Sequence, residues 1–274
     1  MTLHPLTERE GYDAIRGWLE KRCAIHYPEH KSDLLRQRLA RVQRSFALPS
    51  LSELAQEVTL LQTHEVQLAV MHAASTNHTY FYREKEVLDH FRTVVLPDLV
   101  TRREIRLWSA ACSTGDEVYT LAILIAESCG MDVLRRTTIL GTDISAPVIE
   151  QAERGIYPAR HLDQVPAAIR SKYMRPVGIE QFQIIPEIRQ ACTFRRMNLK
   201  TAPFPFRKPF QAVFCRNVLY YFAHDDQVGV INSIAEVTEP GGWLYTSVTE
   251  NVRDFSALWQ TVASGVARRT GAVA

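Results

Sequence analysis

The chain has 274 residues, of which 46% are hydrophobic and 23% are charged. This composition is that of an ordinary globular protein and excludes a disordered chain or a fibre. The length allows one sizeable core with a smaller second unit beside it. The formal net charge of +2 is too small to indicate that the whole surface binds nucleic acid or a membrane.

The cysteines and the apolar stretches limit the cellular setting. The five cysteines are scattered and form no CxxC pair, so we expect neither a metal site nor a disulfide framework. No uninterrupted apolar run approaches bilayer length, and the first residues do not resemble a signal peptide. We therefore expect a reducing, cytoplasmic location without insertion into a membrane.

Residues 1–73 predict a small helical domain. Apolar side chains recur there at helical spacing, as at Ile15, Trp18 and Leu19, and a further helical pattern runs from Leu51 to Met71. Little β-type alternation occurs in this region. We expect a bundle of helices that forms a separate module.

Residues 74–274 follow a different pattern, in which short apolar runs alternate with helical stretches. This pattern is typical of an α/β sheet and predicts a doubly wound, Rossmann-like domain. The expected elements are a strand at 105–112, a turn at 113–115, a helix at 117–129, a strand at 138–142, a helix at 146–154 with Ser145 as its cap, a strand at 210–215, a helix at 225–238, a turn at 240–242 and a strand at 243–248.

The segment at about 156–193 interrupts this pattern. It contains four prolines and a short alternating stretch at 181–185. We expect a small β-subdomain there, inserted into the main sheet and including an antiparallel hairpin.

Candidate ligand-binding residues fall at the expected carboxyl ends of strands, where doubly wound sheets bind ligands. The loop at 111–117 has a single glycine, lacks a GxGxxG pattern, and carries Asp116 and Glu117, which would repel a pyrophosphate. Asp143 ends the next strand, where a carboxylate can accept hydrogen bonds from ribose hydroxyls. An ordinary turn and a helix cap are the alternatives. Together these features favour a nucleoside without phosphate, of which S-adenosylmethionine is the commonest cofactor.

Two further groups follow later strands. Asn198 and Leu199 are placed to meet an adenine edge, although a simple loop asparagine is the alternative. Arg216 and Asn217 end a buried strand, where such side chains are costly unless they are paired or face a cavity. We favour function over packing for this pair. The polar and aromatic segment 75–84 is expected to cover the site.

Six segments occur in one order along the chain: STNHTYFYRE, WSAACSTGDEVYTLA, ILGTDIS, QAERGIY, MNL and FCRNVLYYF. Together they resemble the CheR-type protein-glutamate O-methyltransferases that modify chemoreceptors, and the resemblance covers about residues 5 to 250. The helical domain and the β-subdomain also suit this family. Substitutions such as Ala111, Asp116, Val118 and Gln211 depart from its pattern without removing an expected contact, whereas the segment 247–250 replaces the usual GHSE at the rim.

The resemblance implies S-adenosylmethionine-dependent methylation of glutamate carboxylates, with S-adenosylhomocysteine as the product. The implied partner is the cytoplasmic domain of methyl-accepting chemoreceptors, with no nucleic acid, and we expect a monomer. The implied cofactor-binding residues are Asn77, Thr79, Arg83, Glu117, Asp143, Asn198, Leu199, Arg216 and Asn217. The resemblance places Arg83 and Tyr221 closest to methyl transfer, and Tyr220 is expected to pack.

The chemistry of this reaction requires no general base. A glutamate side chain has a pKa of about 4.3, so the carboxylate is already ionised at neutral pH. The site must align it with a sulfonium and exclude water. Arg83 is suited to orienting the carboxylate by a forked hydrogen bond, and Tyr221 to positioning the same group.

A basic helix face in the N-terminal domain is the candidate receptor-docking surface. On a helical wheel over residues 31–46, one side is apolar and the rest is basic. The apolar residues are Leu35, Leu39, Val42 and Phe46, and the basic ones are Arg36, Arg38, Arg41 and Arg44. The family resemblance favours docking onto acidic receptor helices, with a solvated surface as the alternative. The short loop at 175–180 favours binding without a receptor peptide tether.

Two other functions share part of this pattern. A nucleic-acid methyltransferase would use the same cofactor, but amino-methylating enzymes usually carry an Asn/Asp-Pro-Pro-aromatic turn where this chain has Arg216-Asn217-Val218-Leu219. A non-catalytic module that only binds S-adenosylmethionine is the second alternative. It is disfavoured by the presence of Arg83, Asp143, Asn217 and Tyr221.

Overall fold

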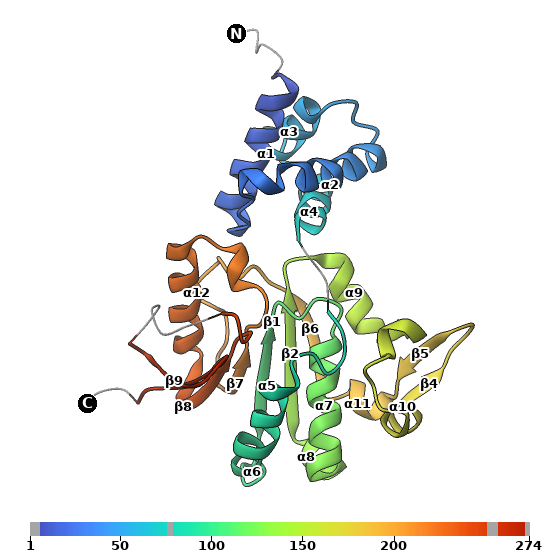
Figure 1. Ribbon diagram of the computed structural model, residues 1–274, viewed down its shortest axis with the longest axis vertical. Coiled ribbons are helices and arrows are strands. Elements are labelled where there is room, and N and C mark those ends of the chain that lie inside the picture. Colours follow the sequence, from blue (N-terminus) through green and yellow to red (C-terminus); the bar gives the residue numbers. More distant parts are fainter. Residues whose placement is uncertain (1–5, 76–78, 251–256, 272–274) are drawn as a thin grey trace.

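The computed structural model describes residues 6–75, 79–250 and 257–271 and consists of a helical domain followed by an α/β domain (Figure 1). The helical domain contains α1 (Glu8–Cys23), a 3₁₀ turn (Glu29–Lys31), α2 (Ser32–Ser45), α3 (Leu51–Thr59) and α4 (His64–Ala74). The expected domain boundary at residue 73 lies beside the last residue of α4. Within these ranges, no helix combines the length and apolar character that a bilayer crossing needs.

The helical domain has a hydrophobic core of its own. α1 begins at a capping box, in which the Thr7 hydroxyl accepts from the backbone of Glu10 while the Glu10 carboxylate accepts from the backbone of Thr7. One face of α1 buries Ile15 and Leu19 completely, and Leu35 of α2 belongs to the same cluster. The domain therefore packs around its own apolar residues and presents its other faces to solvent and to the α/β domain.

Seven strands form the main sheet, and their order confirms the expected doubly wound fold. In spatial order they are β6 (Cys192–Arg196), β2 (Thr137–Asp143), β1 (Ile105–Ala110), β7 (Phe210–Phe214), β8 (Thr238–Tyr245), β10 (Val266–Arg269) and β9 (Trp259–Ala263). The first five are parallel, and the last two pair antiparallel. The chain runs outward from β1 to β6 and then returns to β7, so the topological switch lies between β1 and β7.

Alternate side chains of β1 enter two different cores. Leu107 packs into the core on one face, and the neighbouring Trp108 packs into the core on the other. The first face is covered by α5 (Lys85–His90), a π-helix (Phe91–Val95), α6 (Leu96–Leu99), α7 (Asp116–Cys129), α8 (Met131–Arg135) and α9 (Ala146–Arg154), and the second by α12 (His224–Glu236). Because both faces are covered, the central strands are apolar on both sides.

The expected β-subdomain lies between α9 and β6. It contains β3 (Ile156–Pro158), a 3₁₀ turn (Ala159–Leu162), α10 (Ala167–Tyr173), β4 (Met174–Pro176), β5 (Gln181–Ile184) and α11 (Pro186–Arg189). Its three strands pair antiparallel in the order β3-β5-β4, and β4 and β5 form the predicted hairpin. The main sheet resumes with β6 at Cys192, which agrees with an excursion that ends at about residue 193.

The expected turn at Pro240–Gly242 is wrong, because these residues lie inside β8. Pairing between β7 and β8 shifts there, from Phe210 opposite Thr238 to Ala212 opposite Trp243. A side chain on Gly242 would lie 2.7 Å from a methyl group of Thr238. The glycines therefore permit an irregularity within the strand and do not end it.

Ser145 occupies the N-cap position of α9, but its hydroxyl does not cap the helix as expected. The hydroxyl lies 2.6 Å from Nδ1 of His72 on α4 instead. The carboxylate of Asp143 accepts from the Ser145 backbone amide at 2.9 Å. Ser145 therefore joins the two domains.

Gly11 sets how closely α1 and α3 approach. A Cβ atom at Gly11 would lie 2.6 Å from the carbonyl carbon of Leu51, so Gly11→Ala should lower the free energy of unfolding by about 1–3 kcal/mol. Gly17 on the same helix has nothing within 4 Å of such an atom, and Gly17→Ala should raise it by about 0.5–1 kcal/mol. Urea unfolding of the two variants measures the contrast. Equal effects would refute the tight crossing.

Candidate functional site

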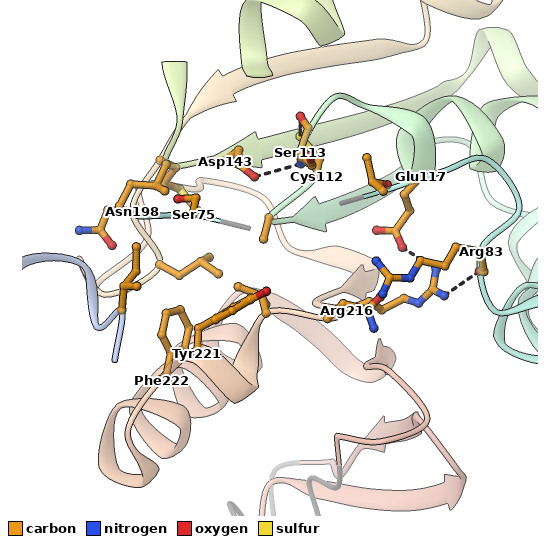
Figure 2. Close-up of a pocket in the computed structure, with 18 of the residues that line it drawn as sticks. Ser75, Arg83, Cys112, Ser113, Glu117, Asp143, Asn198, Arg216, Tyr221 and Phe222 are labelled. Carbon is orange, nitrogen blue, oxygen red and sulfur yellow. Dashed lines mark hydrogen bonds and ion pairs between the residues drawn. The ribbon is translucent and has the colours of Figure 1, made fainter. Parts of the chain in front are cut away.

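A pocket opens at the carboxyl ends of β1, β2, β6 and β7, where the topology switches (Figure 2). Most of the predicted site residues meet there. Those that line it are Thr79, Arg83, Glu117, Asp143, Asn198, Leu199, Arg216, Asn217 and Tyr221. Asn77, also predicted, lies outside the described residues. Segments far apart in the sequence therefore form one cavity.

The loop between β1 and α7 is held against β2 and α9. The Cys112 amide donates to the carbonyl of Thr142 at 2.8 Å, and the Ser113 amide donates to Asp143 at 2.9 Å. Gly115 has a φ of +88°, and a Cβ atom on it would lie 2.9 Å from that of Ala152. Glycine is required here because the backbone is left-handed and the helices are close. The loop therefore presents a defined edge to the pocket.

Asp143 is the deepest acidic group of the pocket. Its two carboxylate oxygens accept the backbone amides of Ser113 and Ser145, each at 2.9 Å. Burial raises the pKa of Asp143, and these backbone hydrogen bonds oppose the rise. An ionised carboxylate has about four acceptor positions. Asp143 can therefore organise the loop and still accept hydrogen bonds from ribose hydroxyls.

Arg216 lies between two carboxylates at the opposite side of the pocket. Its Nη1 donates to Glu117 at 2.6 Å, its Nη2 lies 3.3 Å from Glu84, and the same Nη2 donates to the carbonyl of Arg83 at 2.7 Å. Only 3% of the Arg216 side chain is exposed. Ser109 completes the cluster by donating to Glu117. These contacts explain how an arginine is tolerated at the end of a buried strand.

One polar atom of this cluster still needs an acceptor. Nε of Arg216 is buried, and no described residue accepts its hydrogen. A carboxylate from a bound molecule would satisfy it. The other end of the pocket is apolar, with Ile25, Met197 and Leu199. A polar end and an apolar end match the amino-acid and adenine ends of S-adenosylmethionine, so the residues fit this cofactor.

Glu250 holds the loop that follows β7. Its carboxylate accepts the backbone amides of Asn217, Leu219 and Ser247 at 2.8–3.0 Å. Burial raises the pKa of Glu250, and the backbone hydrogen bonds oppose the rise. Asn217 has a left-handed φ of +57°, and its side chain donates to Glu84. No individual role was predicted for Glu84 or Glu250, although Glu84 ends the segment 75–84 that was expected to cover the site and Glu250 ends the rim segment 247–250.

Tyr221 and its neighbour Tyr220 have different surroundings on the 3₁₀ turn Leu219–Tyr221. Tyr221 lines the pocket, and Figure 2 shows its ring directed into it. Tyr220 was expected to pack, but 51% of it is exposed. Tyr221 therefore lines the pocket, whereas Tyr220 does not.

Asn198 lines the pocket as expected, but its amide already makes hydrogen bonds within the protein. Its Nδ2 donates to the carbonyl of Arg22 at the end of α1, and its Oδ1 accepts from Lys200. Figure 2 shows this side chain directed away from the other labelled groups. The reason is that the helical domain closes over this loop. No sequence pattern relates residues so far apart.

The predicted docking arginines are not equivalent. Arg38 turns towards the domain junction, where its Nη1 donates to Tyr27 at 2.8 Å and to the carbonyl of Ala74 at 3.0 Å. Arg36 lies 4.0 Å from the centre of the Tyr12 ring. These two residues therefore make contacts within the protein, which corrects the uniform basic face expected for α2. The other two, Arg41 and Arg44, are exposed.

The helical domain also contributes to the pocket, which the sequence did not predict. Cys23 and Ile25, at the end of α1, line the pocket beside Phe222 of the α/β domain. Lys200 reinforces this contact by donating to the carbonyl of Glu20. Only the folded arrangement of the two domains reveals this wall.

Comparisons with known proteins agree with this geometry. The family model described as "CheR methyltransferase, SAM binding domain" matches residues 77–267, and "CheR methyltransferase, all-alpha domain" matches residues 10–70. Together with the fold, the first match defines the α/β domain as an S-adenosylmethionine-dependent methyltransferase, so S-adenosylmethionine is its cofactor. The chain belongs to the CheR methyltransferase family.

Curated relatives extend the match over most of the chain. A chemotaxis protein methyltransferase of Borreliella burgdorferi is 31% identical over 84% of this chain and 83% of its own length. Chemotaxis protein methyltransferase 2 of Pseudomonas aeruginosa is 31% identical over 94% of this chain and 92% of its own. The Salmonella typhimurium chemotaxis protein methyltransferase is 32% identical over 88% and 85%, respectively.

The Glu84 carboxylate should make stability depend on pH. Burial raises its pKa, but Asn217, Arg216 and Ser247 outweigh burial and hold the pKa below the ordinary 4.5. The stabilisation is therefore complete above that pH and is lost as the pH falls through the lowered pKa. Glu84→Gln should lower the free energy of unfolding at pH 7 by about 1–3 kcal/mol.

Urea unfolding of wild type and Glu84→Gln between pH 3 and pH 8 measures this effect. The difference between the two proteins should shrink below about pH 4.5. Glu86 is exposed on α5, so Glu86→Gln is a matched control that should stay within about 0.5 kcal/mol of wild type. A difference independent of pH would contradict an ionised Glu84.

Proposed function

We propose that this protein methylates glutamate side-chain carboxylates of chemoreceptors, producing glutamate methyl esters and S-adenosylhomocysteine. The observation that carries the proposal is that Arg83 and Tyr221 line the same pocket as Glu117 and Asp143. A guanidinium and a phenol are suitable groups for binding a carboxylate. The curated relatives are named as chemotaxis protein methyltransferases, which supports the same conclusion.

In this proposal, different pocket residues bind different parts of the cofactor. Asp143 accepts hydrogen bonds from the ribose hydroxyls, Nε of Arg216 donates to the methionyl carboxylate, and Leu199 contacts the adenine. When bound, S-adenosylmethionine supplies an electrophilic methyl group on a positively charged sulfur. Thr79, Asn217 and the neutralised Glu117–Arg216 pair complete the polar end of the pocket.

The protein acts on the substrate by orientation and by exclusion of water. Arg83 orients the glutamate carboxylate, and the Tyr221 hydroxyl donates to one of its oxygens. The other oxygen is left unprotonated and would be free to accept the methyl group that S-adenosylmethionine would supply, with the electron pair of the carbon–sulfur bond remaining on sulfur. No proton is transferred, so no general base is required. Apolar walls such as Phe222 keep water from stabilising the separated charges.

Incubation with labelled cofactor and receptor cytoplasmic domains tests the proposal. The expected product carries label that is released as methanol by mild base, because carboxyl methyl esters are base-labile. Receptor variants with aspartate or glutamine at the methylated glutamates should lose the label. Cofactor binding without labelled receptor would indicate a module that only binds S-adenosylmethionine, and base-stable label would indicate a different acceptor.

Arg83→Ala should lower kcat by about 100-fold or more, because the carboxylate loses the group that orients it. The urea unfolding midpoint should stay near that of wild type, since Arg83 is only partly buried. Steady-state kinetics with a receptor domain measure the change. The control is Arg92→Ala, which removes an exposed arginine that pairs with Asp89 on α5. Wild-type turnover in Arg83→Ala would refute the role of Arg83.

We also propose that Arg41 and Arg44 contact acidic receptor helices. Both are exposed on α2, in the domain that walls the pocket. Reversing both charges should raise KM about 10-fold and weaken its dependence on salt, because steering between exposed charges is screened by ions. The matched control is Arg135→Glu on α8, at the far end of the molecule (Figure 1). Equal effects of the reversals at both places would exclude specific docking.

A further inference from the structure

Tyr220 does not line the pocket, but its side chain contacts Tyr221, which does. The two rings lie side by side, with centroids 4.4 Å apart and planes inclined by 50°. The Tyr220 hydroxyl donates to the Tyr221 hydroxyl across 3.3 Å. Since half of Tyr220 is exposed, packing does not explain its position. In the described part of the chain, the polar contact of the Tyr220 hydroxyl is this hydrogen bond to Tyr221.

The direction of this hydrogen bond determines where the Tyr221 proton points. A phenol has one hydrogen to donate and can accept hydrogen bonds on its oxygen. Because Tyr221 accepts from Tyr220, its own hydrogen must be directed elsewhere. No described residue accepts it, and Figure 2 shows the Tyr221 ring directed into the pocket. The hydroxyl is thus left to donate to a molecule in the pocket.

The backbone beneath the pair is held at several points. The carbonyl of Tyr221 accepts from the amide of His26 at 2.8 Å, and the amide of Leu219 donates to buried Glu250 at 2.8 Å. These bonds come from both domains and from both ends of the 3₁₀ turn. The backbone that carries the two tyrosines is therefore fixed, and so is the position of one hydroxyl relative to the other, as a hydrogen-bond relay requires.

The positive charge of Arg83 acts on Tyr220. Burial, followed by the hydrogen bond to Tyr221, raises the pKa of Tyr220, and the Arg83 charge opposes this rise. The phenol is therefore protonated at neutral pH and can donate. Arg83 also lies over the Tyr80 ring, 5.7 Å from its centre. Arg83 and Tyr221 line the same pocket, and the Arg83 charge also acts on Tyr220 beside it.

We propose that Tyr220 is a positioning residue, which directs the Tyr221 hydroxyl onto the substrate carboxylate by donating a hydrogen bond to it. The inference rests on the proposed function, because it requires a carboxylate substrate beside Tyr221. Accepting one hydrogen bond makes a hydroxyl a better donor of another. Tyr220 thereby strengthens and aims the contact of Tyr221 without touching the reacting atoms.

Kinetics of Tyr220→Phe with a receptor domain test this role. The variant keeps the ring and removes only the donor, so kcat should fall about fivefold, as expected for one hydrogen bond. KM and the cofactor Kd, measured by calorimetry, should stay within about twofold of wild type. The control, Tyr173→Phe, removes a hydroxyl that bonds Glu127 outside the pocket and should leave kcat unchanged.

A double-mutant cycle separates the relay from a direct contact. In a Tyr221→Phe background, Tyr220→Phe should cause no further loss, because the acceptor of its hydrogen bond is gone. An equal loss in both backgrounds, an effect on KM alone, or an unchanged kcat would overturn the relay while wild-type methylation continues. If wild type itself forms no base-labile ester on receptors, the proposed function fails, and the relay fails with it.

Discussion

The buried charge of Arg216 is the constraint on which the site depends. A guanidinium at the end of a buried strand is costly to desolvate unless its donors are satisfied. Glu117 on α7 and Glu84 before α5 supply the opposite charges, and the carbonyl of Arg83 accepts one more hydrogen. The segment at 83–84 and the start of α7 are therefore both fixed around one side chain. The position of Arg83 at the pocket follows from this requirement.

The same cluster connects the cofactor end of the pocket to the loop that carries the tyrosines. Glu84 accepts from Asn217 and from Ser247, and Glu250 gathers the amides around them. A carboxylate that accepts several hydrogen bonds is immobile, and so are its donors. These hydrogen bonds hold the left-handed backbone of Asn217. They therefore also fix the first residue of the 3₁₀ turn, which begins two residues later.

Local sequence signals predicted the fold well and the domain contacts poorly. The helix α9 was predicted to the residue, because Ser145 precedes it and Gly155 ends it with a left-handed φ. The Pro240–Gly242 segment was mistaken for a turn, because its composition is that of turns whereas its conformation depends on pairing with β7. Four groups of residues at expected strand ends indicated the pocket. The amide of Asn198 and the inward direction of Arg38 depend on partners in other parts of the chain.

The helical domain contributes to the site as well as to the proposed docking surface. It carries the exposed Arg41 and Arg44, and it also supplies Ile25 to the pocket wall and the His26 amide to the carbonyl of Tyr221. A receptor helix held by the first group would lie on the same rigid unit that fixes the second. The two domains are joined by polar contacts such as that between Asn198 and Arg22. These contacts hold the helical domain over the pocket. The proposed docking and the proposed alignment of the carboxylate would therefore be geometrically linked through α1 and the residues that follow it.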